Sequence, residues 1–187
     1  EKPTIAVVEV THALRQVGAG AGVHSLVLQD YGLDVTAIDL SAGAVTYMKT
    51  LGLNAKQLDF YALKPTQKYN TILSLMNGFG LAQKLSKLPA FLKHAYDLLE
   101  PGGCLIADST DVKYLYEDED GSVWLDLNAE YYGNFKFQMH YKKISGPEFE
   151  WLYIDYDTLH QQATEMGFKC RRACTYEDHY LAVLQKP

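Results

Sequence analysis

The sequence predicts an α/β fold in which helices cover a mostly parallel β-sheet. Three patterns along the chain carry this prediction. Short apolar runs alternate with helical patterns through the first half, which is the order of βαβ units. A glycine-rich stretch at residues 16–24, QVGAGAGVH, joins a short strand to a helix, as in open α/β sheets. Near the other end, two strand patterns meet at the turn Glu177–Asp178 and predict an antiparallel hairpin.

The composition describes one globular domain over residues 1–187. The chain is 48% hydrophobic and 21% charged, which is enough apolar material for a sizeable core. Seventeen Lys and Arg against 23 Asp and Glu give a net charge of −6, so a nucleic-acid partner is not expected. No apolar run approaches the roughly 18 residues of a membrane span, so we expect no membrane partner and a cytoplasmic location. The three cysteines, Cys104, Cys170 and Cys174, lack paired spacing, which predicts reduced thiols and no metal site.

Glycines and capping residues set the boundaries of the elements in the first half. Helices are expected after the glycine-rich stretch, after the capping residue Ser41, and over residues 88–99. In the first of these helices, Val23, Leu26 and Val27 share one helical face. The segment EPGG, residues 100–103, is a sharp stop for the third helix. Strand patterns alternate with the helices, at residues 34–38, 55–58, 69–76 and 104–108.

The composition of the sequence changes after the predicted strand at residues 104–108, the fifth strand in the chain. Residues 112–156 contain twelve of the 23 aromatic residues and alternate as antiparallel strands do. We predict an inserted aromatic-rich β module over residues 112–155, with a hairpin whose turn is Ser145-Gly146-Pro147. Residues that follow the fifth strand lie over the mouth of the site in such folds, so this module is expected to act as a substrate lid or as a dimer contact. A last helix, capped by Asp155, then leads to strands at residues 168–176 and 179–184.

The glycine-rich stretch at residues 16–24 is the main indication of a ligand-binding site in the sequence. In an open α/β sheet the ligand lies beyond the carboxyl ends of the strands, and glycines let the backbone approach it closely. A dinucleotide-binding loop has the spacing GxGxxG, whereas this chain has GxGxG, with Val23 where the third glycine or an alanine would stand. An acidic residue, Asp39, ends the next strand. A nicotinamide-dependent oxidoreductase would share Gly18, Gly20 and Asp39, so this alternative remains open at this point.

Further segments follow in the order of one family. They are AIDLS at 37–41, LDF at 58–60, NGF at 77–79, LLEPGGCL at 98–105 and AVL at 182–184. With the glycine spacing, they make the chain resemble class I S-adenosylmethionine-dependent methyltransferases over roughly residues 16–108 and 156–184. The resemblance implies a Rossmann-like seven-stranded sheet, mostly parallel with an antiparallel C-terminal hairpin, and leaves the β-hairpin insertion outside it.

The resemblance also implies which residues bind the cofactor. The loop of Gly18, Ala19, Gly20 and Gly22 would leave room for the methionine part of S-adenosylmethionine, and the Asp39 carboxylate would accept from both ribose hydroxyls. Asp59 would accept from the adenine amino group, with Leu40 and Phe60 beside the ring. Met76 and Asn77 would border the sulfonium. The alternatives are that Asp39 and Asp59 are only helix caps and that Phe60 is simply part of the core.

The expected activity is transfer of a methyl group from S-adenosylmethionine to a small-molecule acceptor by direct displacement, with S-adenosylhomocysteine as product and no metal. A displacement at an already activated carbon mainly requires alignment, and the sequence singles out no general base. Asn77 is not followed by Pro-Pro and an aromatic residue, which argues against methylation of nucleic-acid bases.

One departure from the family pattern keeps other classes open. Gln16 stands where the family usually has an acidic residue, which makes a non-catalytic binding module a second alternative. The strand before the loop is also short, so we expect an irregularity or break in the backbone between Thr11 and Gln16, and further residues upstream of Glu1. A homodimer is a further expectation.

Overall fold

The computed structural model describes residues 14–124 and 130–187. Seven of its strands form one sheet in the order β3-β2-β1-β4-β5-β9-β8. The first five in the chain pair in parallel, and β9 is antiparallel to both of its neighbours. The predicted α/β class with a mixed, mostly parallel sheet is therefore confirmed. The strands are β1 (Leu14–Val17), β2 (Val35–Asp39), β3 (Asn54–Gln57), β4 (Tyr69–Ser74), β5 (Leu99–Thr110), β8 (Lys169–Tyr176) and β9 (His179–Gln185).

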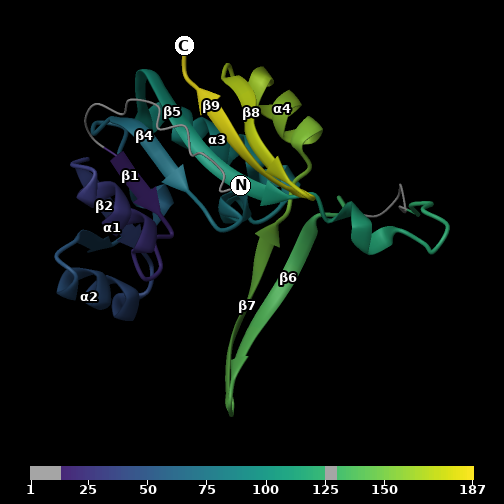
Figure 1. Ribbon diagram of the computed structural model, residues 1–187, viewed down its shortest axis with the longest axis horizontal. Helices are drawn as coiled ribbons and strands as arrows, with labels where there is room; N and C mark the ends of the chain where they lie inside the picture. Colours follow the sequence, from purple (N-terminus) through teal and green to yellow (C-terminus); the bar gives the residue numbers. More distant parts are fainter. Residues whose placement is uncertain (1–13, 125–129) are drawn as a thin grey trace.

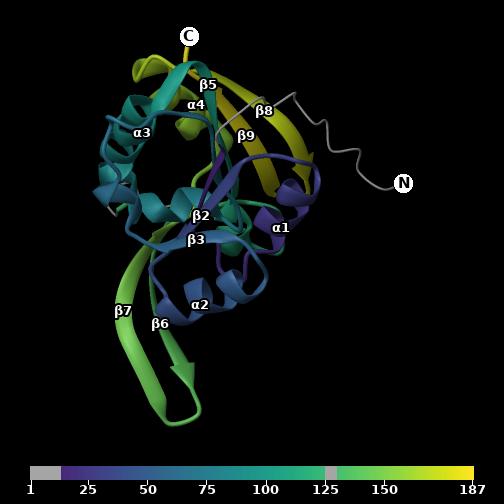
Figure 2. The same ribbon diagram turned by 90° about the vertical axis from the view of Figure 1, so that its left-hand side faces the viewer.

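Helices cover both faces of this sheet, with α1 and α3 on opposite sides (Figures 1 and 2). The α-helices are α1 (Val23–Asp30), α2 (Ala42–Thr50), α3 (Leu88–Leu98) and α4 (Tyr156–Glu165). Short 3-10 turns lie between them, namely η1 (Phe60–Ala62), η2 (Gly78–Ala82), η3 (Leu85–Lys87) and η4 (Val112–Tyr116). The largest core cluster includes residues of α3 and α4, and a smaller one joins α2 to Ala37 and Ala55 of the sheet. Among the described residues, no helix has the length and apolarity needed to cross a membrane.

The helix after the glycine-rich loop does not bury the face that its pattern suggested. Val23 is 64% exposed and Val27 is 50% exposed, whereas Ser25 is fully buried. The periodicity of apolar residues defines the faces of a helix, but it does not fix which face packs on the sheet. The rotation of the helix about its axis, which decides this, depends on how the chain enters the helix. Here the chain enters through Gly22, which caps α1 in the left-handed conformation.

The remaining two strands form a separate ribbon that projects from the body of the molecule (Figures 1 and 2). They are β6 (Asn134–Tyr141) and β7 (Ile144–Leu152), paired antiparallel. The turn predicted at Ser145-Gly146-Pro147 is wrong, because these residues lie within β7 and the chain turns at Lys142 and Lys143. The pairing skips from Gln138↔Glu148 to His140↔Ser145, so Pro147, which has no N–H to donate, lies at a bulge where the ladder does not need one.

The base of the ribbon packs on the chain that follows β4. A Cβ added at Gly80 would lie 2.0 Å from Cε2 of Trp151, so this indole rests directly on the glycine backbone. The ribbon therefore begins at the edge of the sheet where the parallel strands end. At the start of the described chain, β1 is an unbroken strand from Leu14, and the part of the expected break at residues 11–13 lies outside the described residues.

Candidate functional site

The glycines of the loop between β1 and α1 have different reasons to be glycine. Gly18, Gly20 and Gly22 all have positive φ, at 63°, 54° and 80°. A Cβ at Gly18 or Gly20 would meet nothing within 4 Å, so the open space beside these two is available to a ligand. A Cβ at Gly22 would lie 2.6 Å from Cδ1 of Leu53 and 2.8 Å from Cγ of Met48. The missing side chain of Gly22 therefore makes room for the protein's own core, and its place in the cofactor site stays a prediction.

Asp39 at the end of β2 ties the loop to the sheet. Its Oδ2 accepts from the backbone N–H of Gly20 at 2.8 Å, and its Oδ1 accepts from the N–H of Ser41 at 2.8 Å. The helix cap of α2 is Ser41, whose hydroxyl accepts from the N–H of Ala44 at 3.2 Å, so Asp39 is not the cap. Each carboxylate oxygen has a second lone pair for a hydroxyl donor. The pair of oxygens thus lies beside the open part of the loop.

The next predicted residues follow β3. Asp59 caps the 3-10 turn η1, with Oδ1 accepting from the N–H of Tyr61 at 2.9 Å. Phe60 is only 4% exposed and packs on the rings of Phe91 and His94, so its ring belongs to the core and does not face the open edge. Leu40, by contrast, is 67% exposed.

Tyr61, the second residue of η1, is an aromatic residue for which the sequence predicted no role. Tyr61 is 43% exposed, and its hydroxyl donates to the carbonyl of Leu81 at 3.2 Å. Burial, together with the nearby Asp59 carboxylate, raises the pKa of Tyr61 to about 12. The signal in the sequence was its place two residues after Asp59, since residues just beyond the acid at a strand end lie at the same edge.

The chain makes a strained turn at the end of β4. Met76 and Asn77 have φ of 66° and 61°, in the left-handed region that costs a non-glycine residue roughly 1–2 kcal/mol. The side chain of Met76 is 78% exposed. The Asn77 side chain turns inward, where its Oδ1 accepts from Oγ of Ser109 at 3.0 Å and its Nδ2 donates to the carbonyl of Leu152 at 3.2 Å. Asn77 can therefore offer its backbone, but not its side-chain amide, to a ligand at this edge.

A carboxylate of β5 holds the residue after this turn. Oδ1 of Asp108 accepts from the N–H of Gly78 at 2.9 Å, and Oδ2 lies 3.0 Å from Nε2 of His179. The other ring nitrogen of His179, Nδ1, is 3.0 Å from Oγ1 of Thr110. His179 had no signal in the sequence, because its relation to Asp108 arises only from the pairing of β5 with β9.

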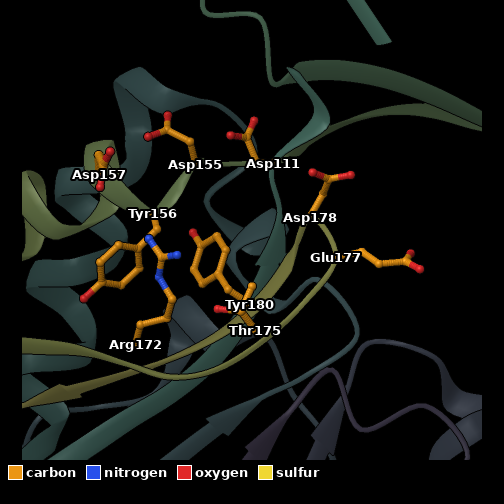
Figure 3. Close-up of a pocket in the computed structure, with 9 residues that line it drawn as sticks. All are labelled: Asp111, Asp155, Tyr156, Asp157, Arg172, Thr175, Glu177, Asp178 and Tyr180. Carbon is orange, nitrogen blue, oxygen red and sulfur yellow. The ribbon is translucent and has the colours of Figure 1, made fainter. Parts of the chain in front are cut away.

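A pocket of about 230 Å³ lies at the far end of the same edge (Figure 3). In it the Arg172 guanidinium lies over the ring of Tyr156, 4.0 Å from its centroid, while Asp111, Asp155 and Asp178 gather nearby. This pocket adjoins β8 and β9, beyond β5 in the sheet order, so it is separate from the glycine loop. The described residues contain no group of three or more His, Cys, Asp or Glu side chains suited to a metal ion.

Comparisons with known proteins agree with this geometry. A family model described as a methyltransferase domain matches residues 16–103. A SAM-dependent methyltransferase from Bacteroides fragilis, crystallised with S-adenosyl-L-homocysteine, is 42% identical with a TM-score of 0.86, over 94% of this chain and 73% of that chain. The glycopeptide N-methyltransferase MtfA, in complex with S-adenosylmethionine, is 15% identical with a TM-score of 0.66, over 97% and 90% of the two chains. A methyltransferase from Clostridium acetobutylicum ATCC 824 is 12% identical with a TM-score of 0.67, over 95% and 85%.

No curated protein sequence matches the chain. The identity and coverage of the Bacteroides fragilis structure nevertheless establish the family: the chain belongs to the class I S-adenosylmethionine (SAM)-dependent methyltransferases. It is an enzyme that uses SAM, and the oxidoreductase and non-catalytic alternatives give way to this assignment. The two more distant structures show the shared fold alone. The residues present fit the cofactor, because the loop is open at Gly18 and Gly20 and the Asp39 carboxylate lies beside it.

Proposed function

We propose that the protein transfers the methyl group of SAM to a small-molecule acceptor by direct displacement. The observation that carries the proposal is the contact between Asp39 and the loop. The Asp39 carboxylate, 2.8 Å from the backbone nitrogen of Gly20, can accept hydrogen bonds from the two ribose hydroxyls. The glycine backbone beside it lacks side chains, so the rest of the cofactor can approach it closely.

The proposed contacts follow the strands along the edge. The backbone of Gly18, Ala19 and Gly20 binds the methionine part, and Asp39 accepts from the ribose hydroxyls. Asp59 and the exposed Leu40 bind the adenine. Met76 and the backbone of Asn77 lie at the sulfonium end. In this arrangement Gly22 and Phe60 support the site through their packing in the core. Gly22 shapes the loop, and the buried Phe60 ring supports η1.

Bound SAM supplies a methyl group already activated by the positive sulfur. The task of the chain is to orient the acceptor opposite the sulfur and to exclude water, because a poorly aligned displacement loses most of its rate. None of the described side chains is assigned as a general base. His140 and Tyr141 lie near the exposed tip of the ribbon, where Nδ1 of His140 is 2.9 Å from Oγ of Ser145.

We propose that the ribbon over β6 and β7, at the centre of the predicted insertion, forms a wall of the acceptor site. Five aromatic rings contact one another along its strands and just beyond the end of β7, namely Phe135, Phe137, Phe149, Trp151 and Tyr153. Its base contacts the residues after the β4 turn, at Gly80 and Asn77. An aromatic surface that starts beside the sulfonium end suits a small apolar or aromatic acceptor. A dimer contact is the alternative use of the same surface.

Calorimetric titration with S-adenosylhomocysteine tests the cofactor part of the proposal. We expect micromolar binding by the wild-type protein and none measurable by Asp39→Ala. Asp34→Ala is the matched control, because Asp34 is an exposed aspartate at the opposite end of β2. NADH, titrated in parallel, should not bind. Equal binding by Asp39→Ala and wild type, or binding of NADH alone, would contradict the proposal.

The acceptor part needs a separate experiment. The protein is incubated with methyl-labelled SAM and one of two fractions of a single bacterial lysate, either its small molecules or its proteins. Label transferred to the small-molecule fraction, and reduced when Phe137 and Phe149 are both replaced by Ser, supports the proposal. Label found only in the protein fraction would contradict it.

A further inference from the structure

The left-handed turn at Met76 and Asn77 is held by contacts from outside its own strand. Asn77 is fixed from β5 through Ser109 and from β7 through the carbonyl of Leu152. The peptide N–H of Gly78, the next residue, donates to Oδ1 of Asp108 at 2.9 Å. Met rarely adopts the left-handed conformation, which Asn tolerates better, so the strain at Met76 persists only where its surroundings hold it in place.

Asp108 is well suited to hold such a turn. Its side chain is 9% exposed, so its charge must be balanced by hydrogen bonds from the protein. Oδ2 is engaged by Nε2 of His179, whose ring is fixed in turn by Oγ1 of Thr110. With its orientation set by these contacts, the carboxylate keeps Oδ1 directed at Gly78. A hydrogen bond from an N–H to a charged acceptor is among the stronger ones in proteins.

We propose that Asp108, oriented by His179, is a positioning residue for the methionine end of the cofactor. By fixing the N–H of Gly78, it keeps the backbone of Met76 and Asn77 in the shape that receives the amino acid and sulfonium part of SAM. The inference rests on the proposed cofactor site, and it adds a residue that does not itself contact the ligand. Asp108 is distant from the adenine end, which lies beyond β1 in the sheet order.

Two ligands that share the adenosine part separate positioning from general loss of structure. S-adenosylhomocysteine carries the amino acid part and adenosine does not. In Asp108→Ala we expect affinity for S-adenosylhomocysteine to fall by roughly 10-fold to 100-fold, the range for a hydrogen bond to a charged group, while affinity for adenosine is unchanged. Asp108→Asn, which keeps an oxygen acceptor for Gly78, should bind S-adenosylhomocysteine within about threefold of wild type.

Controls make each outcome decisive. Asp178→Ala removes an exposed carboxylate from the same edge and should leave both affinities unchanged. If Asp108→Ala does not fold, Asp108→Ser replaces it, because its hydroxyl keeps the position polar but is too short to reach Gly78. Equal losses for both ligands, or no loss for either, would overturn the inference. Failure of the wild-type protein to bind S-adenosylhomocysteine would instead contradict the proposed cofactor site.

Discussion

At the scale of single residues, the same amino acid serves different ends within one loop. Gly18 and Gly20 border open space, whereas Gly22 borders Leu53 and Met48. All three need a positive φ, so substitution strains the backbone at each, but only at Gly22 does a side chain also collide with the core. Binding and folding roles can thus be separated by measurement.

Gly22→Ala is expected to lower the free energy of unfolding by roughly 2–4 kcal/mol, about 1 from the positive φ and the rest from overpacking. Gly52→Ala is the control, since Gly52 has a similar φ of 78° and nothing within 4 Å of its Cβ position. It should lose about 1 kcal/mol. Urea denaturation followed by circular dichroism measures both, and equal losses would contradict the packing role.

Asp155 is a second residue whose contribution can be measured. Its carboxylate caps α4 by accepting from the N–H of Thr158 at 2.8 Å, and it also accepts from the hydroxyl of Tyr131 at 2.5 Å. Burial acts to raise the pKa of Asp155, but the two donors lower it below the usual range. The depressed pKa means that Asp155 stabilises the fold above the pKa of an unfolded aspartate, and that this stability is lost as pH falls through the folded pKa.

Asp155→Ala should therefore lower the free energy of unfolding by about 1–2 kcal/mol at neutral pH. The difference from wild type should stay constant from pH 7 to about 5 and then shrink towards about pH 2, because the unfolded wild-type chain takes up a proton at Asp155 before the folded protein does. Denaturant titrations across this range test the prediction. A difference that stays constant with pH would show that the charge of Asp155 is not involved.

At the scale of elements, the ribbon depends on its contact with the body. An isolated two-stranded hairpin is marginally stable in water, so β6 and β7 need a support. Glu150 forms ion pairs with Lys84 and Lys87 at 3.3 and 3.1 Å, but exposed pairs contribute little. The packing of Trp151 on Gly80 is the stronger anchor.

Gly80→Ala should displace the indole and destabilise the protein by roughly 2–4 kcal/mol. Trp151→Ala should also destabilise it, but the double variant should lose at least about 1 kcal/mol less than the sum of the two, because the new methyl group then occupies vacated space. Urea denaturation of the three variants gives the coupling. Additive losses would mean that the two residues do not act on each other.

At the scale of the whole molecule, ligand binding should stabilise the fold. S-adenosylhomocysteine at 100 times its Kd should add about 2.7 kcal/mol to the free energy of unfolding. For a domain of this size that corresponds to a Tm increase of roughly 5–10 °C. Thermal denaturation with and without ligand measures it. Asp39→Ala at the same ligand concentration should show no increase, and an equal increase in that variant would argue against Asp39 as a ligand-binding residue.

The order of elements could be predicted from the sequence because it depends on local patterns. Apolar periodicity, Ser41 and Asp155 as caps, and the acid at the end of β2 all act within a few residues of themselves. The direction of side chains could not be predicted in the same way. The inner face of α1, the buried ring of Phe60 and the inward amide of Asn77 depend on what each element packs against.

The sequence by itself therefore determined the family and the cofactor, because both follow from short motifs in a set order. The tertiary structure alone decided which of the predicted site residues pack into the core and which are exposed. Gly22 and Leu53 meet across two elements, and Asp108, Gly78 and His179 come from three strand ends that are far apart in the chain. Such contacts depend on sheet order and register, which only the packing of the complete chain establishes.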